Sequence, residues 1–282
     1  MAEREAAIER QKRETAEKHL EDERRRKADA LAKQKKETAE HSSNEASIAI
    51  AMQKAETAHE GTQRGQLGTK EGDDGRGKVQ LWEGGPYWAE MNIGAEKPED
   101  YGYYFWWGDT KGYKRVSGDW VANDGSSSNF WFGAANTPTY GEDSSQLRAE
   151  EWITSYDVIV PEHDAAHIHW GGDWRMPTVQ ELSGLSSKCD WTWTTMNGVQ
   201  GYLVKGKGTY ASASIFLPCA GLVDGTSLEL VGSDGYYWSS VPHSDDYDDA
   251  WYLYFYSRRH TTYYIYYRLR GRSVRPVQGF TN

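Results

Sequence analysis

One histidine-rich segment has the residue types of a metal site. His163, His167 and His169 lie close together, with Glu162 and Asp164 beside them. Imidazoles and carboxylates at such spacing are ligands that Zn²⁺ accepts. However, the spacing does not match the helical pattern H-E-x-x-H. We therefore expect a hydrogen-bonded loop packed beside tryptophans, with no metal and no cofactor.

Two cysteines, Cys189 and Cys219, are the only thiols of the chain. They do not form a C-x-x-C motif, which would indicate a metal or redox site. The favoured interpretation is a pair of buried apolar thiols, and the sequence leaves a single disulfide open. Neither thiol matches a catalytic arrangement, so we expect no enzymatic activity.

The most unusual segment is the run from His243 to Arg272, HSDDYDDAWYLYFYSRRHTTYYIYYRLRGR. It is rich in Tyr, Asp, His, Ser, Thr and Arg, and it contains no Lys, Glu, Gln or Met. Surfaces that recognise diverse targets favour Tyr, because its rigid amphipathic ring supplies contact area at little entropic cost. The composition therefore predicts a ligand-binding surface.

Alternation within this run predicts a strand over 250–256. Trp251, Leu253 and Phe255 would share one face of that strand, whereas the tyrosines at 252, 254 and 256 would share the other. The first set suits a core. We expect the tyrosine face to be exposed, since polar residues flank it, and the alternative is a strand buried on both faces.

The remaining chain must position this run. Residues 1–60 are rich in Ala, Glu, Lys, Arg and Gln and contain no Pro or Gly, which predicts a helical stalk or coiled coil. The alternative is a tail that orders only in a larger assembly. A Gly-rich linker at 61–78 separates it from a domain over 79–282. We expect the stalk to make a homotrimer, although its thin apolar stripe does not distinguish two strands from three.

The domain pattern predicts a mixed, loop-rich α+β fold. Short strands are expected at 79–82, 87–93, 214–218, 236–241, 250–256 and 273–277, with a long folded loop region over 108–148. The clearest helix signal is Thr178 followed by Glu181, which fits a capping box before the apolar residues Val179, Leu182 and Leu185.

The charge balance argues against nucleic acid as a partner. The formal net charge is −10, and it lies entirely in residues 79–282, because residues 1–78 hold 17 basic and 17 acidic residues. Binding to nucleic acid draws mainly on clustered Lys and Arg. We also find no apolar stretch of membrane-spanning length and no secretory signal at the start, so we expect synthesis in the cytoplasm and no membrane insertion.

Five phrases in order resemble the C-type-lectin fold in its formylglycine-generating-enzyme-like branch. They are YWAEMNIGA from Tyr87, EDYGYYFWWGDT from Glu99, GDWRMPT with EL from Gly172, YWSS from Tyr237, and GRSVRPV from Gly271. The resemblance covers about 79–277 and implies a C-type-lectin-type domain. The cysteines do not match that enzyme's active site, which leaves a non-catalytic role.

The C-terminal run further resembles the variable region of diversity-generating retroelement target proteins, here over about 236–277. In that family a reverse transcriptase replaces template adenines, mostly in Asn codons, and Lys, Glu, Gln and Met cannot arise from such codons. The resemblance implies that the following residues are diversified ligand contacts: His243, Asp245, Tyr247, Asp248, Tyr252, Tyr254, Tyr256, Arg258, Arg259, His260, Tyr263, Tyr264, Ile265, Tyr266, Tyr267, Leu269 and Arg270. It implies a fixed scaffold between them, namely Trp251, Leu253, Phe255 and Gly271.

Calcium-dependent sugar binding is a second option that the lectin resemblance raises. The expected Glu-Pro-Asn and Trp-Asn-Asp ligand motifs are absent from the sequence. The acidic cluster Asp245, Asp246, Asp248 and Asp249 has the oxygen ligands that Ca²⁺ prefers. We nevertheless expect a solvated charged loop there.

These features lead to one functional prediction with two alternatives. We expect a phage tail-fibre or receptor-binding adhesin of a Bacteroidales phage or prophage, found on the virion or a cell surface. Its partner would be a cell-surface protein or glycoconjugate of a host bacterium, contacted by Tyr rings and by Arg258, Arg259, Arg268 and Arg270. The alternatives are a surface adhesin of fixed specificity and a structural virion protein.

Overall fold

A computed structural model describes residues 76–125, 137–244 and 248–279 of the chain. All of them belong to one compact unit, which spans Glu71–Thr281. The predicted stalk at 1–60 and nearly all of the predicted linker at 61–78 lie outside the described residues.

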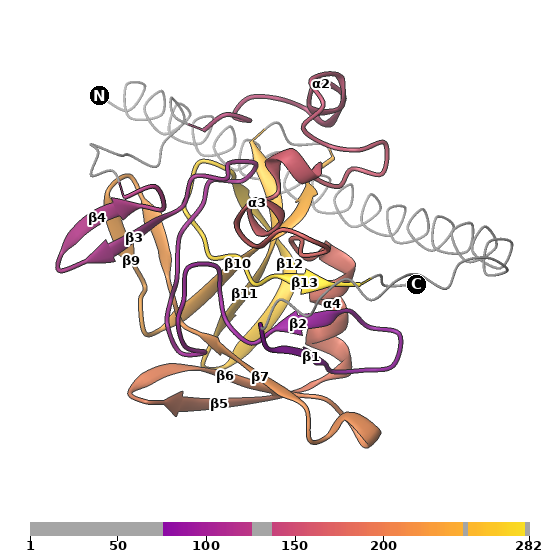
Figure 1. Cartoon of the computed structure of the whole chain (residues 1–282), viewed down its shortest axis with the longest axis vertical. Helices are drawn as coiled ribbons and strands as arrows, with labels where there is room; N and C mark the ends of the chain where they lie inside the picture. The colour runs from indigo at the N-terminus through magenta and orange to yellow at the C-terminus, as the bar shows by residue number, and fades with distance from the viewer. Residues whose placement is uncertain (1–75, 126–136, 245–247, 280–282) are drawn as a thin grey trace, which may run out of the picture. The chain divides into compact units, whose positions relative to one another are not determined.

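Short antiparallel sheets dominate this unit (Figure 1). Three of them have three strands each: β1 (Lys78–Gln80), β2 (Tyr87–Ala89) and β13 (Val277–Gln278); β5 (Asp190–Met196), β6 (Val199–Lys205) and β7 (Ser214–Pro218); and β10 (Asp234–Pro242), β11 (Asp249–Tyr256) and β12 (Arg259–Tyr267). Two further pairs are β3 (Tyr113–Val116) with β4 (Asp119–Ala122), and β8 (Leu222–Asp224) with β9 (Ser227–Glu229).

Helices are few and short in the described part of the chain. They are α2 (Ser144–Ala149), α3 (Ala165–Trp170) and α4 (Val179–Lys188), with 3₁₀ turns η2 (Pro161–His163) and η3 (Gly208–Tyr210). Such a mostly β, loop-rich domain with few helices agrees with the α+β prediction. None of these helices has the length and apolar character needed to cross a membrane.

The start of α4 confirms the predicted capping box. The hydroxyl of Thr178 accepts a hydrogen bond from the Glu181 amide, and the Glu181 carboxylate accepts one from the Thr178 amide. Glu181 is fully buried and also forms an ion pair with Arg175, with Nη2 and Oε1 2.5 Å apart. This one carboxylate therefore caps α4 and fixes the loop before it.

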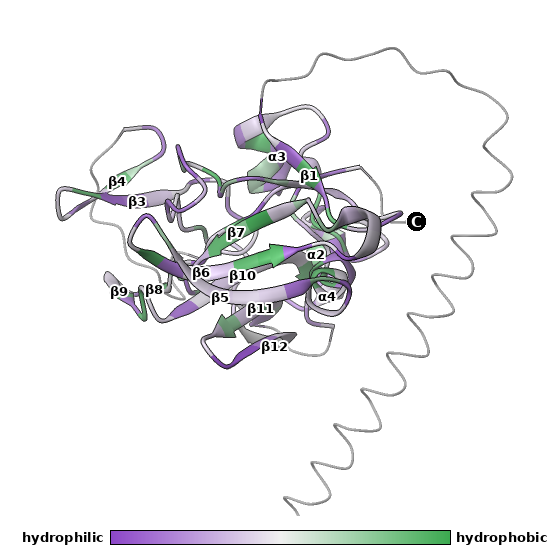
Figure 2. Ribbon diagram, turned by 90° about the horizontal axis from the view of Figure 1, so that it is seen from below, coloured by the Kyte–Doolittle hydropathy of each residue, from purple (hydrophilic) through white to green (hydrophobic). Residues whose placement is uncertain are grey.

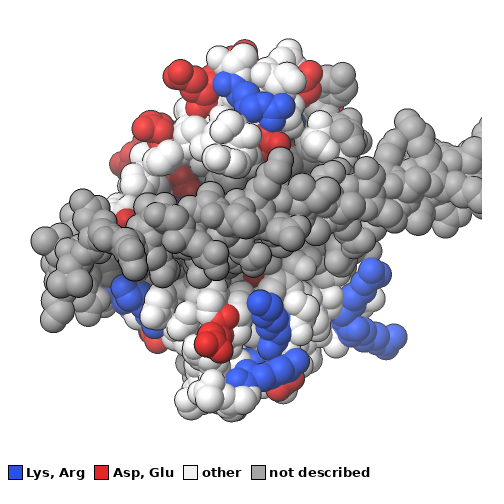
Figure 3. All heavy atoms as spheres, turned by 90° about the vertical axis from the view of Figure 1, so that its right-hand side faces the viewer, with Lys and Arg blue, Asp and Glu red and all other residues white. Residues whose placement is uncertain are grey.

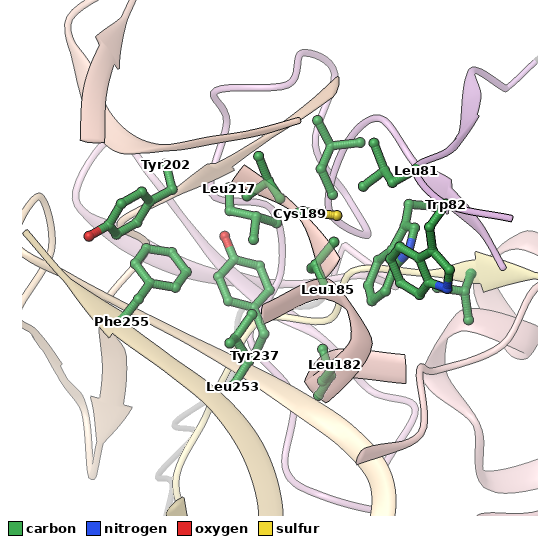
Figure 4. Close-up of a cluster of buried hydrophobic side chains, with 14 of the residues drawn as sticks. Leu81, Trp82, Leu182, Leu185, Cys189, Tyr202, Leu217, Tyr237, Leu253 and Phe255 are labelled. Atoms are coloured by element: carbon green, nitrogen blue, oxygen red, sulfur yellow. The ribbon is translucent and has the colours of Figure 1, made fainter. Parts of the chain in front are cut away.

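The central sheet β10–β11–β12 has hydrophobic clusters on both faces. One cluster contains Tyr237, Leu253 and Phe255 of this sheet together with Leu182 and Leu185 of α4 (Figure 4). A second cluster lies against Tyr236, Trp238 and Tyr252 on the opposite face and draws on the loops before α3. Strand β7, whose middle is Ile, Phe and Leu, is green in Figure 2, whereas the tyrosines and serines of β10 are buried without being strongly hydrophobic on that scale.

Several predicted boundaries need correction. Strands β1, β2 and β13 are shorter than the predicted segments at 79–82, 87–93 and 273–277, whereas β7 matches 214–218. The region 108–148, predicted to be a folded loop, contains β3, β4 and α2. The sequence interpretation also missed β5, β6 and β12, whose polar and aromatic residues do not give a clean apolar alternation.

Candidate ligand-binding surface

Exposure within the run 243–272 separates the predicted contact residues from the residues between them. Eleven of the predicted contacts have described side chains, and ten of these are half-buried or exposed. Twelve other residues of the run have described side chains, and nine of those are buried, including Leu253, Phe255, Thr261, Thr262 and Gly271. The run therefore consists of a buried framework with outward side chains between its members.

Strand pairing places a row of tyrosines on the face of β10 and β11 that packs against the second hydrophobic cluster. Tyr236 lies opposite Tyr254, with ring centroids 4.9 Å apart, and Tyr256 follows Tyr254 at 5.8 Å. The Tyr254 hydroxyl donates a hydrogen bond to Asp234 Oδ1 at 2.8 Å. Burial and this carboxylate raise the pKa of Tyr254, so the phenol stays protonated and acts as a donor.

Tyr252 is a correction to the predicted exposed face. Its side chain is 5% exposed and belongs to the hydrophobic core. The Arg272 guanidinium carbon lies 3.8 Å from the Tyr252 ring centroid and 3.9 Å from that of Trp238. Tyr252 is buried because a distant segment covers it. Alternation puts it on the same face as Tyr254 and Tyr256, but the segment around Arg272 packs over that part of the face.

Arg272 is itself an unusual core residue. It is fully buried, and its Nε and Nη1 atoms have no hydrogen-bond partner. Burial lowers the pKa of Arg272 to about 10, with the neighbouring phenols of Tyr252 and Tyr236 acting in the opposite direction. The rings of Tyr252 and Trp238 are close, favourable contacts for this cation, and the Tyr236 ring lies 5.9 Å away. Cation–π attraction strengthens in a desolvated site.

His260 is a second correction. It lies across from Phe255 on the core-facing side of the hairpin and stacks on Trp191, with ring centroids 4.3 Å apart and planes 6° apart. Its Nδ1 is 2.9 Å from the Ser186 hydroxyl of α4. Burial lowers the pKa of His260. The side chain therefore joins the β12 strand to α4 and to the β5 sheet, and it does not share the tyrosine face.

The four arginines predicted to supply ligand contacts separate into different environments. Arg258 and Arg259 are exposed at the turn between β11 and β12. Arg270 is half-buried and forms an ion pair with Asp224 at 2.7 Å. Arg268 is a correction, because it is fully buried and donates to the backbone oxygens of Thr139 and Glu142, each at 2.7 Å.

The opposite end of the hairpin carries the other described contact candidates. His243 and Asp248 are half-buried there, and Tyr267 is 43% exposed. Trp251 was predicted to join Leu253 in the core, but it is half-buried beside His243, with ring centroids 5.4 Å apart. The part of β11 around Trp251, which lies beyond α4, is thus only partly covered on its core-facing side.

Several predicted contacts cannot be placed by their side chains. Asp245 and Tyr247 lie outside the described residues. Tyr263, Tyr264, Ile265 and Tyr266 belong to β12, but their side chains lie outside the described part. Leu269 is half-buried after the end of β12.

The histidine-rich segment does not gather its imidazoles. His163 stacks on Trp152 at 3.7 Å, whereas His169 lies against Phe105 at 5.3 Å and has its Nε2 2.9 Å from the Thr110 oxygen. Over residues 76–125, 137–244 and 248–279, no group of three His, Cys, Asp or Glu side chains has a metal-binding arrangement. The expected loop beside Trp170 and Trp174 is a correction, because the segment forms η2 and α3 and His163 stacks on Trp152 instead.

Both cysteines are buried and free, as the favoured interpretation predicted. Burial raises the pKa of Cys189 to about 11 and that of Cys219 to about 12. Thiols with such pKa values are poor nucleophiles near neutral pH.

Comparison with known proteins yields one partial match. A family model described as "Domain of unknown function (DUF8237)" matches residues 193–277, a span that begins within β5 and includes all of β10–β12. No curated protein and no solved structure matches the chain.

Proposed function

We propose that this chain is a non-catalytic binding protein with a C-type-lectin-type domain and a diversified contact surface. The surface comprises the outward side chains Tyr254, Tyr256, Arg258 and Arg259 at one end of the β11–β12 hairpin, together with His243, Asp248, Tyr267, Leu269 and Arg270. Tyr252 is left out because it is buried, and His260 is left out because it is half-buried and stacks on Trp191.

One observation carries the proposal. Within the run 243–272, ten of the eleven predicted contacts with described side chains are half-buried or exposed, and the residues between them are mostly buried. A binding protein that changes its contacts without losing its fold needs this separation, because core substitutions cost several kcal/mol whereas surface substitutions usually cost about 0.5 kcal/mol or less. The buried strand partners Leu253 and Phe255 supply the constant framework.

The contact chemistry follows from the exposed residues. Phenol rings supply apolar area with a hydrogen-bonding end, and the guanidinium groups of Arg258 and Arg259 supply charge-assisted donors. Such a surface suits a protein or glycoconjugate on a bacterial cell. If residues 1–60 trimerise, three weak sites act together, and avidity exceeds single-site affinity by about 10²–10⁴ when the geometry permits. This combination fits a phage tail-fibre or receptor-binding adhesin.

Three matched libraries test whether the surface is replaceable. The first randomises Tyr254, Tyr256, Arg258 and Arg259 among the residues that mutated Asn codons encode. The second treats the buried residues Leu253, Phe255, Thr261 and Thr262 in the same way. The third treats another exposed hairpin end, at Arg115, Val116, Ser117 and Asp119. Each library is displayed, sorted for protease resistance, and selected on a panel of intact Bacteroidales cells.

We expect the first library to stay mostly folded and to yield binders to different cells. The second should lose its folded members, and the third should fold but yield fewer binders. The proposal is wrong if the first library unfolds as often as the second, or if it yields no more binders than the third.

The flanking DNA tests diversification separately. A reverse-transcriptase gene and an adenine-rich near-copy of codons 243–272 should lie close to this gene. Their absence would remove diversification and leave an adhesin of fixed specificity.

A further inference from the structure

A loop outside the C-terminal run is held against one end of the β11–β12 hairpin. The buried Arg268 guanidinium donates to the Thr139 and Glu142 oxygens, and the Thr139 hydroxyl donates to the Trp107 oxygen at 3.2 Å. The Gly141 amide donates to Asp248 Oδ1 at 3.0 Å. The bonds from Arg268 and to Asp248 link positions more than 100 residues apart in sequence, so they fix where residue 140 lies relative to the hairpin.

Tyr140 is presented by this loop beside two residues of the proposed contact surface. Its side chain is 38% exposed, and that of the hairpin residue Tyr267 is 43% exposed. Asp248 raises the pKa of Tyr140 by its negative charge, and Tyr267 adds to the effect. Geometry places the groups near one another, because Gly141 bonds to the Asp248 carboxylate and Asp249 pairs with Tyr267 across β11 and β12. One phenol comes from the loop and the other two groups come from the run 243–272.

The electrostatics of this end are acidic. Glu142 lies in the same loop, and burial and the nearby Glu150 raise the pKa of its carboxyl group. Arg268 is buried against backbone oxygens of this loop, and Arg148 of α2 forms an ion pair with Asp157. Figure 3 shows one face of the molecule, on which acidic groups lie in the upper part with a basic group among them.

We propose that Tyr140, Asp248 and Tyr267 form a site for a lysine or arginine side chain on the surface of a protein partner. Ring faces of Tyr attract a cation within about 6 Å of the ring centroid, and a neighbouring carboxylate adds charge complementarity. Tyr140 would be constant in this site, whereas diversification at positions 248 and 267 would change the chemistry of the site. The inference rests on the proposed function and names the chemistry of one partner group.

Arg268 is a positioning residue for this site. Its buried guanidinium donates to the carbonyl oxygens of Thr139 and Glu142, which precede and follow Tyr140 in the loop. Its guanidinium lies 5.4 Å over the Trp107 ring, which fixes its plane. A lysine at this position would keep the charge but lose the forked geometry that reaches two oxygens.

Titration of the full chain with octalysine tests the proposal. The probe's amines supply the cation, and a side-chain-acetylated octalysine supplies the uncharged comparison. Tyr140→Ala and Asp248→Asn should each raise the Kd for octalysine about two- to fivefold, the range expected for an exposed cation–π or ion-pair contact. Tyr156→Ala and Asp119→Asn are the matched controls, because they remove an exposed phenol and an exposed carboxylate elsewhere. Both controls should leave the Kd unchanged.

Three results would overturn the site. They are equal effects of Tyr140→Ala and Tyr156→Ala, equal binding of acetylated and free octalysine, and binding of a neutral oligosaccharide such as maltohexaose that depends on Tyr140. Thermal melting of each variant verifies the fold. Failure here with successful hairpin libraries would leave the proposed function intact, whereas failure of the libraries would remove the binding surface as a whole.

Discussion

Tyr252 and Tyr256 occupy the same face of β11, yet their side chains differ in burial. Tyr252 is 5% exposed and packs between core residues, with the Arg272 guanidinium on its ring. Tyr256 is half-buried near the end of the strand, opposite Asp234 on one side and Arg259 on the other. Tyr254 lies between them and is half-buried as well. One strand face thus passes from a buried ring to half-buried rings over five residues.

The comparison shows that strand alternation decides a side chain's face but not its depth. Depth at Tyr252 depends on Phe105, Trp107 and Val274, which approach from distant parts of the chain to form the same cluster. For a surface that changes its residues, the consequence is direct. We therefore expect positions 254 and 256 to tolerate exchange, and position 252 to require an aromatic ring that can cover a buried cation.

Truncation of these two tyrosines should give the largest contrast. Tyr252→Ala should lower the free energy of unfolding by about 3–5 kcal/mol, since it leaves a cavity and removes one ring from Arg272. Tyr256→Ala should lower it by about 1 kcal/mol or less. Urea unfolding followed by tryptophan fluorescence measures both values.

Tyr252→Phe controls for the phenol oxygen. It keeps the ring over Arg272 and should recover most of the stability lost in Tyr252→Ala. Equal losses in Tyr252→Ala and Tyr256→Ala would break the comparison and would mean that the outer face of β11 is uniformly exposed in solution.

Local signals in the sequence were sufficient for some elements. The capping box at Thr178 and Glu181 located the start of α4, because its two hydrogen bonds connect residues three apart. Strands β7, β10 and β11 were found from β-branched and aromatic residues. The hairpin β5–β6 was missed, although Asn197 and Gly198 both have positive φ in its two-residue turn, a pattern that favours such hairpins.

The parts that failed depend on contacts between distant segments. Nothing near Tyr252 or His260 indicates that Arg272 covers the first or that Trp191 stacks on the second. Arg268 was expected at the surface because isolated arginines usually are, and its partners lie in a loop about 130 residues earlier. Tyr140 carried no local signal at all, since only the fold brings it beside Asp248.

The intermediate position of Tyr254 can be tested through its hydroxyl group. Tyr254→Phe removes the hydrogen bond to Asp234 and should lower the free energy of unfolding by about 0.5–1.5 kcal/mol, the usual range for one hydrogen bond. Tyr256→Phe is the control and should change it by less than about 0.5 kcal/mol. If the two variants behave alike, the gradient from Tyr252 to Tyr256 is one of ring burial only.

The smallest expected effect concerns the two faces of β12, and it depends on pH. Burial lowers the pKa of His260, so the folded state favours the neutral ring. The resulting stability is present above the unfolded pKa of about 6.5 and is lost as the pH falls through the folded value. His260→Phe keeps a ring against Trp191 and removes the titration. As the pH falls from about 7 to about 5, the variant should therefore become more stable relative to the wild type, as measured by urea unfolding.

Arg259→Ala is the control, because it changes the adjacent exposed side chain. Its difference from the wild type in the free energy of unfolding should stay constant over that pH range. A flat difference for His260→Phe would place the imidazole in water, on the same side as the contact surface.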